Sequence, residues 1–317
     1  MTAFFIFITI KPPLSFNEAS YPMKFTIAML SRLLPTLLLG LSCATYLNAS
    51  EVSTTRLKAT AGAGVGSLLM DEATMLNPAA ISFFQVSSIY IQKSGTDFTA
   101  DDNSPRSSAS EENLLFIASD SKGDVDGSFS YSKQDDRFGK VTRMAASASS
   151  AIGKKSALGF SYSTTKRTGG PLPAKLNQIS AGVTHAISPE FTFGIIVPDV
   201  LGDDPLARRA IAGAQYVYKD FIALMFDAGA GWETDAKESS VVRAAVQLKI
   251  FQDFYMRFGA QEDKGLKKKG TGAGLGWVQP RLVIEAAVAS TQYSELVSIG
   301  QVDEKAKETS FSLSYRF

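Results

Sequence analysis

Hydrophobic and polar residues alternate with a period of two over most of the chain after Ser50. The last segment shows the pattern most clearly, because polar residues alternate there with Phe311, Leu313, Tyr315 and Phe317. Successive side chains of a β-strand point to opposite faces, so this alternation is typical of half-buried strands. The chain therefore predicts an all-β body.

Tight turns and long polar connections follow one another between the alternating segments. Ser188–Glu190 is one of the tight turn signals, and residues 95–111 form one of the long connections. The intervening strands have about nine to thirteen residues, enough for a tilted strand to cross a hydrocarbon layer. About fourteen strands are predicted, over residues 83–93, 112–120, 124–134, 139–152, 155–167, 175–187, 190–198, 208–219, 220–232, 238–251, 254–262, 269–279, 281–293 and 308–317.

This organisation predicts a single antiparallel transmembrane β-barrel of about fourteen strands. A secreted β-sandwich or a soluble solenoid would also contain short strands and glycine-rich turns. The barrel is favoured because the polar faces, as in Gly270–Gly276, consist of small residues rather than the long charged side chains of a water-facing sheet. Amphipathic strands in meander order also close readily on themselves.

Residues 1–49 have the features of a secretory signal peptide. Lys24 and Arg32 precede an apolar run, and small residues follow it near Ala49. We expect cleavage near Ala49 and a true start at Met23, since prolines interrupt the segment before it. Lipidation of the cysteine in this segment and a retained membrane anchor are the alternatives.

Composition argues against several other functions. The net charge is +1, which gives no general attraction to nucleic acid. The single cysteine, Cys43, lies in the predicted signal peptide, and His185 is the only histidine, so no metal site or other cofactor is expected. His185 lies between Val183 and Ile187 on an apolar face, and the sequence locates no nucleophile to partner it, so no catalytic residue is predicted.

A different pattern precedes the first predicted strand. Glycines from Gly62 to Gly66 are followed by an acidic pair and then by an Asn-Pro-Ala sequence. This region resembles the N-terminal region of the FadL-like outer-membrane transporters, which carry hydrophobic molecules. The resemblance implies a plug, or hatch, at residues 50–82 inside a barrel of residues 83–317. The residues that mark the plug are Asp71, Glu72, Asn77, Pro78 and Ala79.

Local patterns add detail to the plug. An apolar stripe at helical spacing runs from Ser67 to Leu76 and predicts a helix that ends at Asn77, because Pro78 disfavours helix at the preceding residue. Glycines at alternate positions facing the lumen are expected to make room for the plug or a ligand. Their spacing does not match a nucleotide-binding loop.

Several charged residues of the predicted strands fall on the face assigned to the lumen. A basic residue on the lipid-facing side would cost about 2 to 4 kcal/mol at mid-membrane, which favours the lumen. These residues either pair with Asp71 and Glu72 of the plug or with one another. They are Arg143, Asp227, Arg243, Lys249, Arg257 and Glu285.

Two further segments suggest partners. The apolar face formed by Leu313, Tyr315 and Phe317 resembles the signal that the barrel-assembly machinery takes up, although an ordinary edge strand would look similar. The basic loop Lys264–Lys269 either contacts lipopolysaccharide phosphates or is simply solvated.

Together these features predict a passive, FadL-like channel for small hydrophobic solutes, such as fatty acids or hydrocarbons, in the outer membrane of a Gram-negative bacterium. The expected partners are the lipid bilayer with its lipopolysaccharide, the barrel-assembly machinery and a small hydrophobic ligand. A non-transporting scaffold or secretion-associated surface barrel is the alternative, motivated by the short loops. A general diffusion pore is a third possibility.

Overall fold

The computed structural model describes residues 52–100, 109–123, 125–136, 139–168, 175–200, 208–233, 235–296 and 303–317. All of them belong to the compact unit Thr45–Phe317. The predicted signal peptide, with Met23, Cys43 and the cleavage position, lies outside the described residues.

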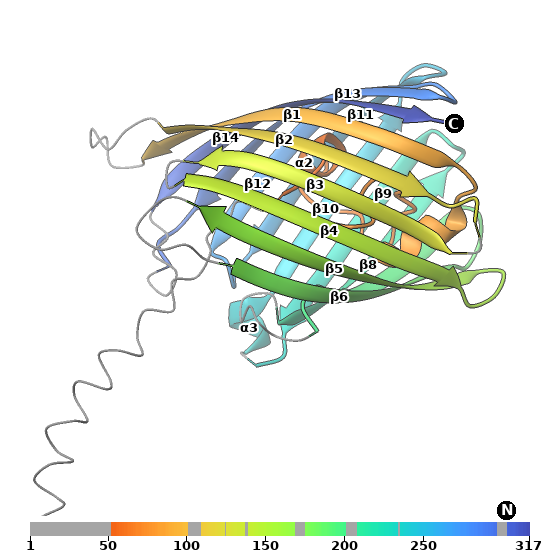
Figure 1. Ribbon diagram of the computed structural model, residues 1–317, viewed down its shortest axis with the longest axis horizontal. Coiled ribbons are helices and arrows are strands. Elements are labelled where there is room, and N and C mark those ends of the chain that lie inside the picture. Colours follow the sequence, from red (N-terminus) through yellow and green to blue (C-terminus); the bar gives the residue numbers. More distant parts are fainter. Residues whose placement is uncertain are drawn as a thin grey trace, which may run out of the picture. The chain divides into compact units, whose positions relative to one another are not determined.

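Within the described part of the chain, fourteen strands close into one antiparallel barrel (Figure 1). Each strand pairs with its neighbours in sequence, and the first pairs with the last, from Ser88 opposite Arg316 to Ala100 opposite Glu304. The predicted fold class is therefore confirmed. The strands are β1 (Ser87–Ala100), β2 (Ala109–Asp120), β3 (Asp126–Asp136), β4 (Gly139–Ala151), β5 (Ser156–Thr168), β6 (Lys175–Ala186), β7 (Phe191–Val197), β8 (Arg209–Tyr218), β9 (Ile222–Gly231), β10 (Val241–Lys249), β11 (Phe254–Asp263), β12 (Lys268–Val278), β13 (Leu282–Tyr293) and β14 (Glu304–Arg316).

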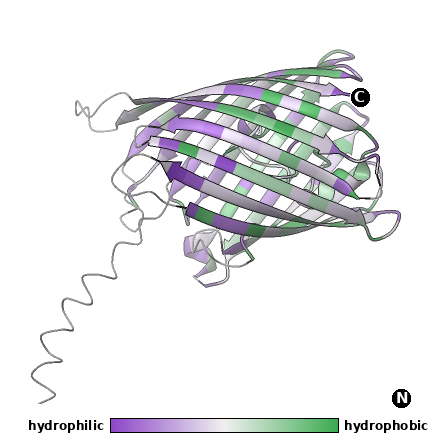
Figure 2. Ribbon diagram, viewed as in Figure 1, coloured by the Kyte–Doolittle hydropathy of each residue, from purple (hydrophilic) through white to green (hydrophobic). Residues whose placement is uncertain are grey.

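The two faces of the wall differ in chemistry, as the alternation requires. On β14, the Phe311 side chain is 55% exposed on the outside, whereas the adjacent Ser312 is 2% exposed on the inside. In Figure 2, hydrophobic green segments occupy much of the strands' length, whereas purple is frequent near their ends. Closure gives the backbone N–H and C=O groups of every strand a hydrogen-bond partner on both sides. A sheet immersed in lipid requires this, because no water is present to bond an open edge.

The ends of β1 and β14 differ from the sequence-based strands. β1 begins at Ser87 rather than near residue 83 and continues to Ala100, and β14 begins at Glu304 rather than near residue 308. Apart from the buried Phe98 and two alanines, the added residues are polar or glycine, and they pair with each other, as Asp97 does with Lys307. A strand without apolar alternation has no periodic signal, so its extent was not visible in the sequence.

Three short helices complete the described structure: α2 (Thr55–Ala59), η1 (Pro78–Phe83) and α3 (Ala236–Ser239). Among the described residues, none of the helices is long and apolar enough to span a membrane.

The prediction of a helix over residues 67–76 that ends at Asn77 is wrong. Residues 67–76 form bends and a turn at residues 71–75, and Asn77 instead precedes η1 as its N-cap, with Pro78 at the first helical position. Side chains of this segment are buried in several directions: Leu69 and Leu76 pack in one cluster, and Met70 packs in another. A helix offers a single apolar stripe and does not match this environment.

Candidate functional site

Residues 52–84 form a plug inside the barrel, visible as the orange segment behind the upper strands in Figure 1. Helix α2 contacts β11 to β14, and η1 contacts β3 to β6. The segment between these helices reaches β8 and β9, where Val65 lies beside Gly213 and bonds to Asp227. The plug is therefore held by strands on opposite sides of the lumen.

Glycines in the wall let the plug backbone approach closely. A β-carbon at Gly272 of β12 would overlap the carbonyl oxygen of Lys58, and one at Gly259 of β11 would overlap the backbone of Thr60. On the other side of the barrel, a β-carbon at Gly182 of β6 would overlap the side-chain Oδ1 of Asn77. The expectation that lumen glycines make room for the plug is confirmed at these positions.

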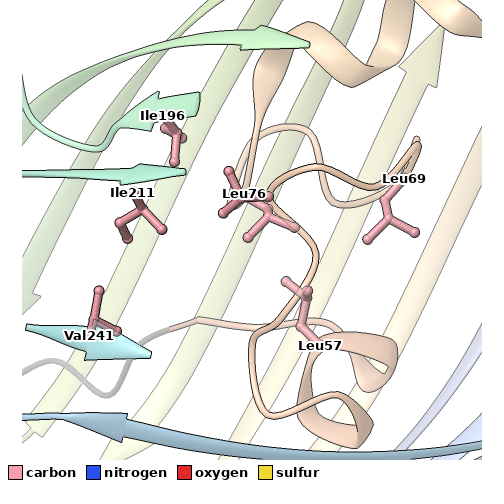
Figure 3. Close-up of a cluster of buried hydrophobic side chains, with 7 residues drawn as sticks. Leu57, Leu69, Leu76, Ile196, Ile211 and Val241 are labelled. Carbon is pink, nitrogen blue, oxygen red and sulfur yellow. The ribbon is translucent and has the colours of Figure 1, made fainter. Parts of the chain in front are cut away.

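A hydrophobic cluster joins the plug to the long-loop ends of β7, β8 and β10 (Figure 3). We call it the plug cluster. Its side chains come from both the plug and the wall, and burying each large aliphatic one contributes about 1.5 to 3 kcal/mol. Its members are Leu57, Val65, Leu69, Leu76, Ile196, Ile211 and Val241, with Met75 packed against them.

A buried group of charges, the core ion cluster, connects α2 to β11 and β13. It consists of Arg56, Glu72, Arg257 and Glu285. Oε1 of Glu285 lies 3.0 Å from Nη2 of Arg56 and 2.9 Å from Nη1 of Arg257. Glu72 is more weakly paired, since its Oε1 is 3.9 Å from Nε of Arg56 and its Oε2 has no hydrogen-bond partner. Glu285 is therefore the centre of this cluster.

The two plug residues of this cluster, Arg56 and Glu72, differ in how their surroundings change their pKa values. Burial raises the pKa of the Glu72 carboxyl above its ordinary value, and nearby Asp71 and Glu285 add to the rise, although Arg56 opposes it. Burial alone would lower the pKa of Arg56, but the surrounding carboxylates outweigh it and the pKa is raised. Arg56 thus stays charged. Of the four charges in the core ion cluster, that of Glu72 contributes least to holding the plug.

Asp227 and Arg243 hold the glycine-rich part of the plug against β9 and β10. The Asp227 carboxylate accepts hydrogen bonds from the backbone N–H of Gly64 at 2.9 Å and of Val65 at 3.1 Å. Arg243 Nη1 donates to the carbonyl oxygen of Gly62 at 3.1 Å. Gly62 and Gly64 have φ angles of 77° and 142°, which disfavour any other residue, so the glycines permit the backbone shape that Asp227 binds.

Asn77 uses its whole side-chain amide. Its Nδ2 donates to the Val65 carbonyl at 2.9 Å, to Thr184 Oγ1 at 3.0 Å and to the Val183 carbonyl at 3.2 Å. Its Oδ1 accepts from the backbone N–H of Ala79 at 3.1 Å. This residue therefore ties two parts of the plug to β6.

Of the two predicted sets of partners for the lumen arginines, the acidic pair of the plug is not the one found, whereas Arg257 pairs with Glu285 of the wall. Asp71 accepts hydrogen bonds from Ser88 Oγ at 2.6 Å and from Ser314 Oγ at 3.1 Å. Glu72 lies next to Arg56, a plug residue that sequence reasoning did not select. Arg56 lies four residues after the start of the described plug, outside any recognisable motif, so only the structure shows its role.

The remaining predicted residues lie on different parts of the wall. Arg143 of β4 faces inward, and its Nη2 donates to the Thr74 carbonyl at 3.4 Å. Tyr315 and Phe317 are exposed and stack on each other at 6.3 Å between ring centroids. His185 Nδ1 lies 2.7 Å from Ser156 Oγ, and its ring lies 5.5 Å from that of Phe193.

A small cavity of about 90 Å³ remains beside the plug. Leu57, Met75 and Leu76 line it from the plug, and its polar lining includes the ion pair between Lys58 Nζ and Glu308 Oε2, which lie 2.7 Å apart. An engineered cavity of about 150 Å³ is known to accept benzene. With the plug seated, this cavity is thus smaller than one known to hold benzene.

These features define a class of architecture: a membrane-type β-barrel of fourteen strands with a plug packed in its lumen. Among solved structures, the chain is similar to CymD, a monoaromatic hydrocarbon channel, with a TM-score of 0.65 and 12% identity over 83% of this chain and 97% of that one. The P. putida toluene transporter TodX is similar with a TM-score of 0.52 and 9% identity, over 84% and 98%. The predicted FadL-like resemblance is thus confirmed for the fold.

A mutant of TodX gives a TM-score of 0.58 at 10% identity, over 84% of this chain and 98% of that one. No protein-family model matches the chain, and no curated protein matches it.

Proposed function

We propose that the chain is a passive outer-membrane channel for small hydrophobic solutes, such as fatty acids or hydrocarbons. The observation that carries this proposal is the plug seated in a closed barrel whose fold is shared with the hydrocarbon channels CymD and TodX. Outward aromatic and aliphatic side chains such as Phe160 and Leu275 suit contact with acyl chains. Such passage needs no cofactor and no catalytic residue.

The orientation follows from the connections. Outer-membrane barrels have short periplasmic turns and longer extracellular loops, so we place the short turns and the C-terminal end of β14 at the periplasmic side. The protein would be exported to the outer membrane of a Gram-negative bacterium. The outward-facing Leu313, Tyr315 and Phe317 are our candidates for recognition by the barrel-assembly machinery.

We propose that passage requires the plug to move, because the plug is packed against strands on opposite sides of the lumen and the cavity beside it has a volume of about 90 Å³. A disulfide between plug and wall tests this requirement. Oγ1 of Thr74 in the plug lies 3.0 Å from Oγ of Ser130 in β3, so we would combine Thr74→Cys with Ser130→Cys in a Cys43→Ser background. The single Thr74→Cys variant is the matched control.

Liposomes that contain the purified protein would be assayed for uptake of toluene. We expect uptake by the unmodified chain, a loss of at least about tenfold on oxidation of the paired cysteines, and recovery on reduction, while the single variant is unaffected. Unchanged uptake through the oxidised pair would show that the plug does not gate passage. Size-dependent uptake of sugars would indicate a general diffusion pore instead.

The tight seating of the plug favours a second candidate, a non-transporting scaffold or secretion-associated surface barrel. Ion pairs, hydrogen bonds and apolar contacts all hold the plug, and a scaffold would use them to stay closed. In that case the liposomes would show no toluene uptake with or without the disulfide, and a stable protein partner would co-purify with the chain.

A further inference from the structure

Four lysines lie together on the outer surface of β3 to β6, near the long-loop ends of these strands. Lys133, Lys140, Lys166 and Lys175 are all exposed. Three of them follow one line across the sheet, because Lys133 is opposite Thr142, Thr142 is opposite Lys166, and Lys166 is opposite Lys175. We call Lys133, Lys166 and Lys175 the lysine row.

The lysine row lacks the ion-pair partners that two other exposed lysines of the wall have. Lys93 lies 3.2 Å from Glu112, and Lys269 lies 3.1 Å from Glu262. Among the described residues, no carboxylate forms an ion pair with a member of the row. Of the acidic residues nearby, Asp135 is opposite Lys140, and Glu112 is paired with Lys93. Like charges directly opposite on neighbouring strands, as Lys166 and Lys175 are, repel each other and destabilise the sheet. A bound external anion would offset this repulsion.

The position of the row on the barrel indicates what that anion is. Directly toward the short turns on the same strands lie exposed apolar side chains, including Phe129, Met144 and Phe160. The row therefore lies at the outer boundary of the apolar band, and Figure 2 shows hydrophilic colouring at these strand ends. Side chains at this height meet lipid headgroups rather than acyl chains or free solution.

We propose that the lysine row binds the phosphate groups of a bisphosphorylated glycolipid headgroup, that of lipopolysaccharide in the outer leaflet. Lysine binds phosphate as a point charge, and neighbouring strands about 4.8 Å apart present several such charges to one headgroup. The proposal rests on the outer-membrane location given above, but not on transport. Lys140 adds a fourth positive charge, which Asp135 offsets in part.

The loop Lys264–Lys269 is less suited to this role. Lys267 Nζ donates to the carbonyl oxygen of Glu295 at 2.9 Å, Lys268 is buried, and Lys269 is paired with Glu262. Most of its charge is therefore already engaged, whereas the lysine row presents its charge to the outside.

The test uses the full barrel, purified in detergent and stripped of bound lipid. Binding of bisphosphorylated lipid A would be measured by native mass spectrometry for the unmodified chain and for the triple variant K133Q/K166Q/K175Q. The control K122Q/K154Q/K219Q removes the same charge from turns at the short-turn end. Dephosphorylated lipid A, phosphatidylglycerol and inorganic phosphate complete the set of ligands.

Each basic residue near an anionic lipid surface contributes roughly a fivefold factor, so the triple variant should bind lipid A about a hundredfold more weakly. The control should bind like the unmodified chain, dephosphorylated lipid A should bind as weakly as the triple variant does, and neither phosphatidylglycerol nor inorganic phosphate should compete. Equal binding by the two triple variants, or equal affinity for phosphatidylglycerol, would overturn the proposal.

The same variants separate this site from channel function. Toluene uptake by K133Q/K166Q/K175Q in liposomes free of lipid A should equal that of the unmodified chain. A chain that transports nothing but binds lipid A through the row would refute the proposed channel and leave the lipid site intact.

Discussion

Replacing Glu285 by Gln should release the plug. Oε1 of Glu285 accepts from both Arg56, at 3.0 Å, and Arg257, at 2.9 Å, and the Glu285 side chain is only 3% exposed. Removing one partner of a buried ion pair costs about 3 to 5 kcal/mol, which corresponds to a roughly 150- to 4,000-fold change in an equilibrium. Because the strand ladder closes without the plug, we expect this loss to favour the undocked plug rather than the unfolded barrel.

Thiol labelling measures the undocked population directly. Ser67 in the plug is buried, so a cysteine at this position, with Cys43→Ser, reacts only when the plug leaves its seat. We expect Glu285→Gln to raise the labelling rate of Ser67→Cys by at least about a hundredfold, with the barrel's urea midpoint little changed.

Glu72→Gln is the matched control, because it makes the same chemical change in the same cluster. Glu72 is weakly paired, has an unpartnered Oε2 and has a pKa raised by burial, so neutralising it should change labelling by less than about fivefold. Equal labelling rates for the two variants would refute the view that Glu285 secures the plug.

Three other substitutions test the seat of the plug by the same labelling assay. Gly272→Ala places a β-carbon on the Lys58 carbonyl and should cost about 1 to 3 kcal/mol, whereas Gly95→Ala, with nothing nearer than 3.9 Å, should have no effect. Equal rates for these two would contradict the close fit. Asn77→Ala should cost about 1 to 3 kcal/mol through the acceptors it leaves unpaired, and unchanged labelling would exclude that role. Leu76→Ala should cost about 2 to 5 kcal/mol, and a loss below this range would mean that the plug cluster collapses around the gap.

Much of the barrel could be predicted from the sequence because a membrane wall imposes a simple rule on each strand. Every strand must present apolar side chains to lipid and small or polar ones to the lumen, so each carries its own period-two signal, as Phe311 and Ser312 show. The number and order of strands follow from the turns between them. The rule ends where a strand no longer alternates apolar and polar residues, which is why the sequence does not predict the outer ends of β1 and β14.

The sequence by itself thus determined the barrel, the presence of a small-residue segment before it and the charged residues of the inner face. Only the tertiary structure decided what these residues bind. Asn77 begins a helix instead of ending one, and Arg56 joins Glu285 across 229 positions of sequence. The lysine row exists only through the register of neighbouring strands. The hydrophobic periodicity of a strand depends only on the residues of that strand. Which side chains meet in the lumen or across the wall depends on the register and closure of the whole barrel.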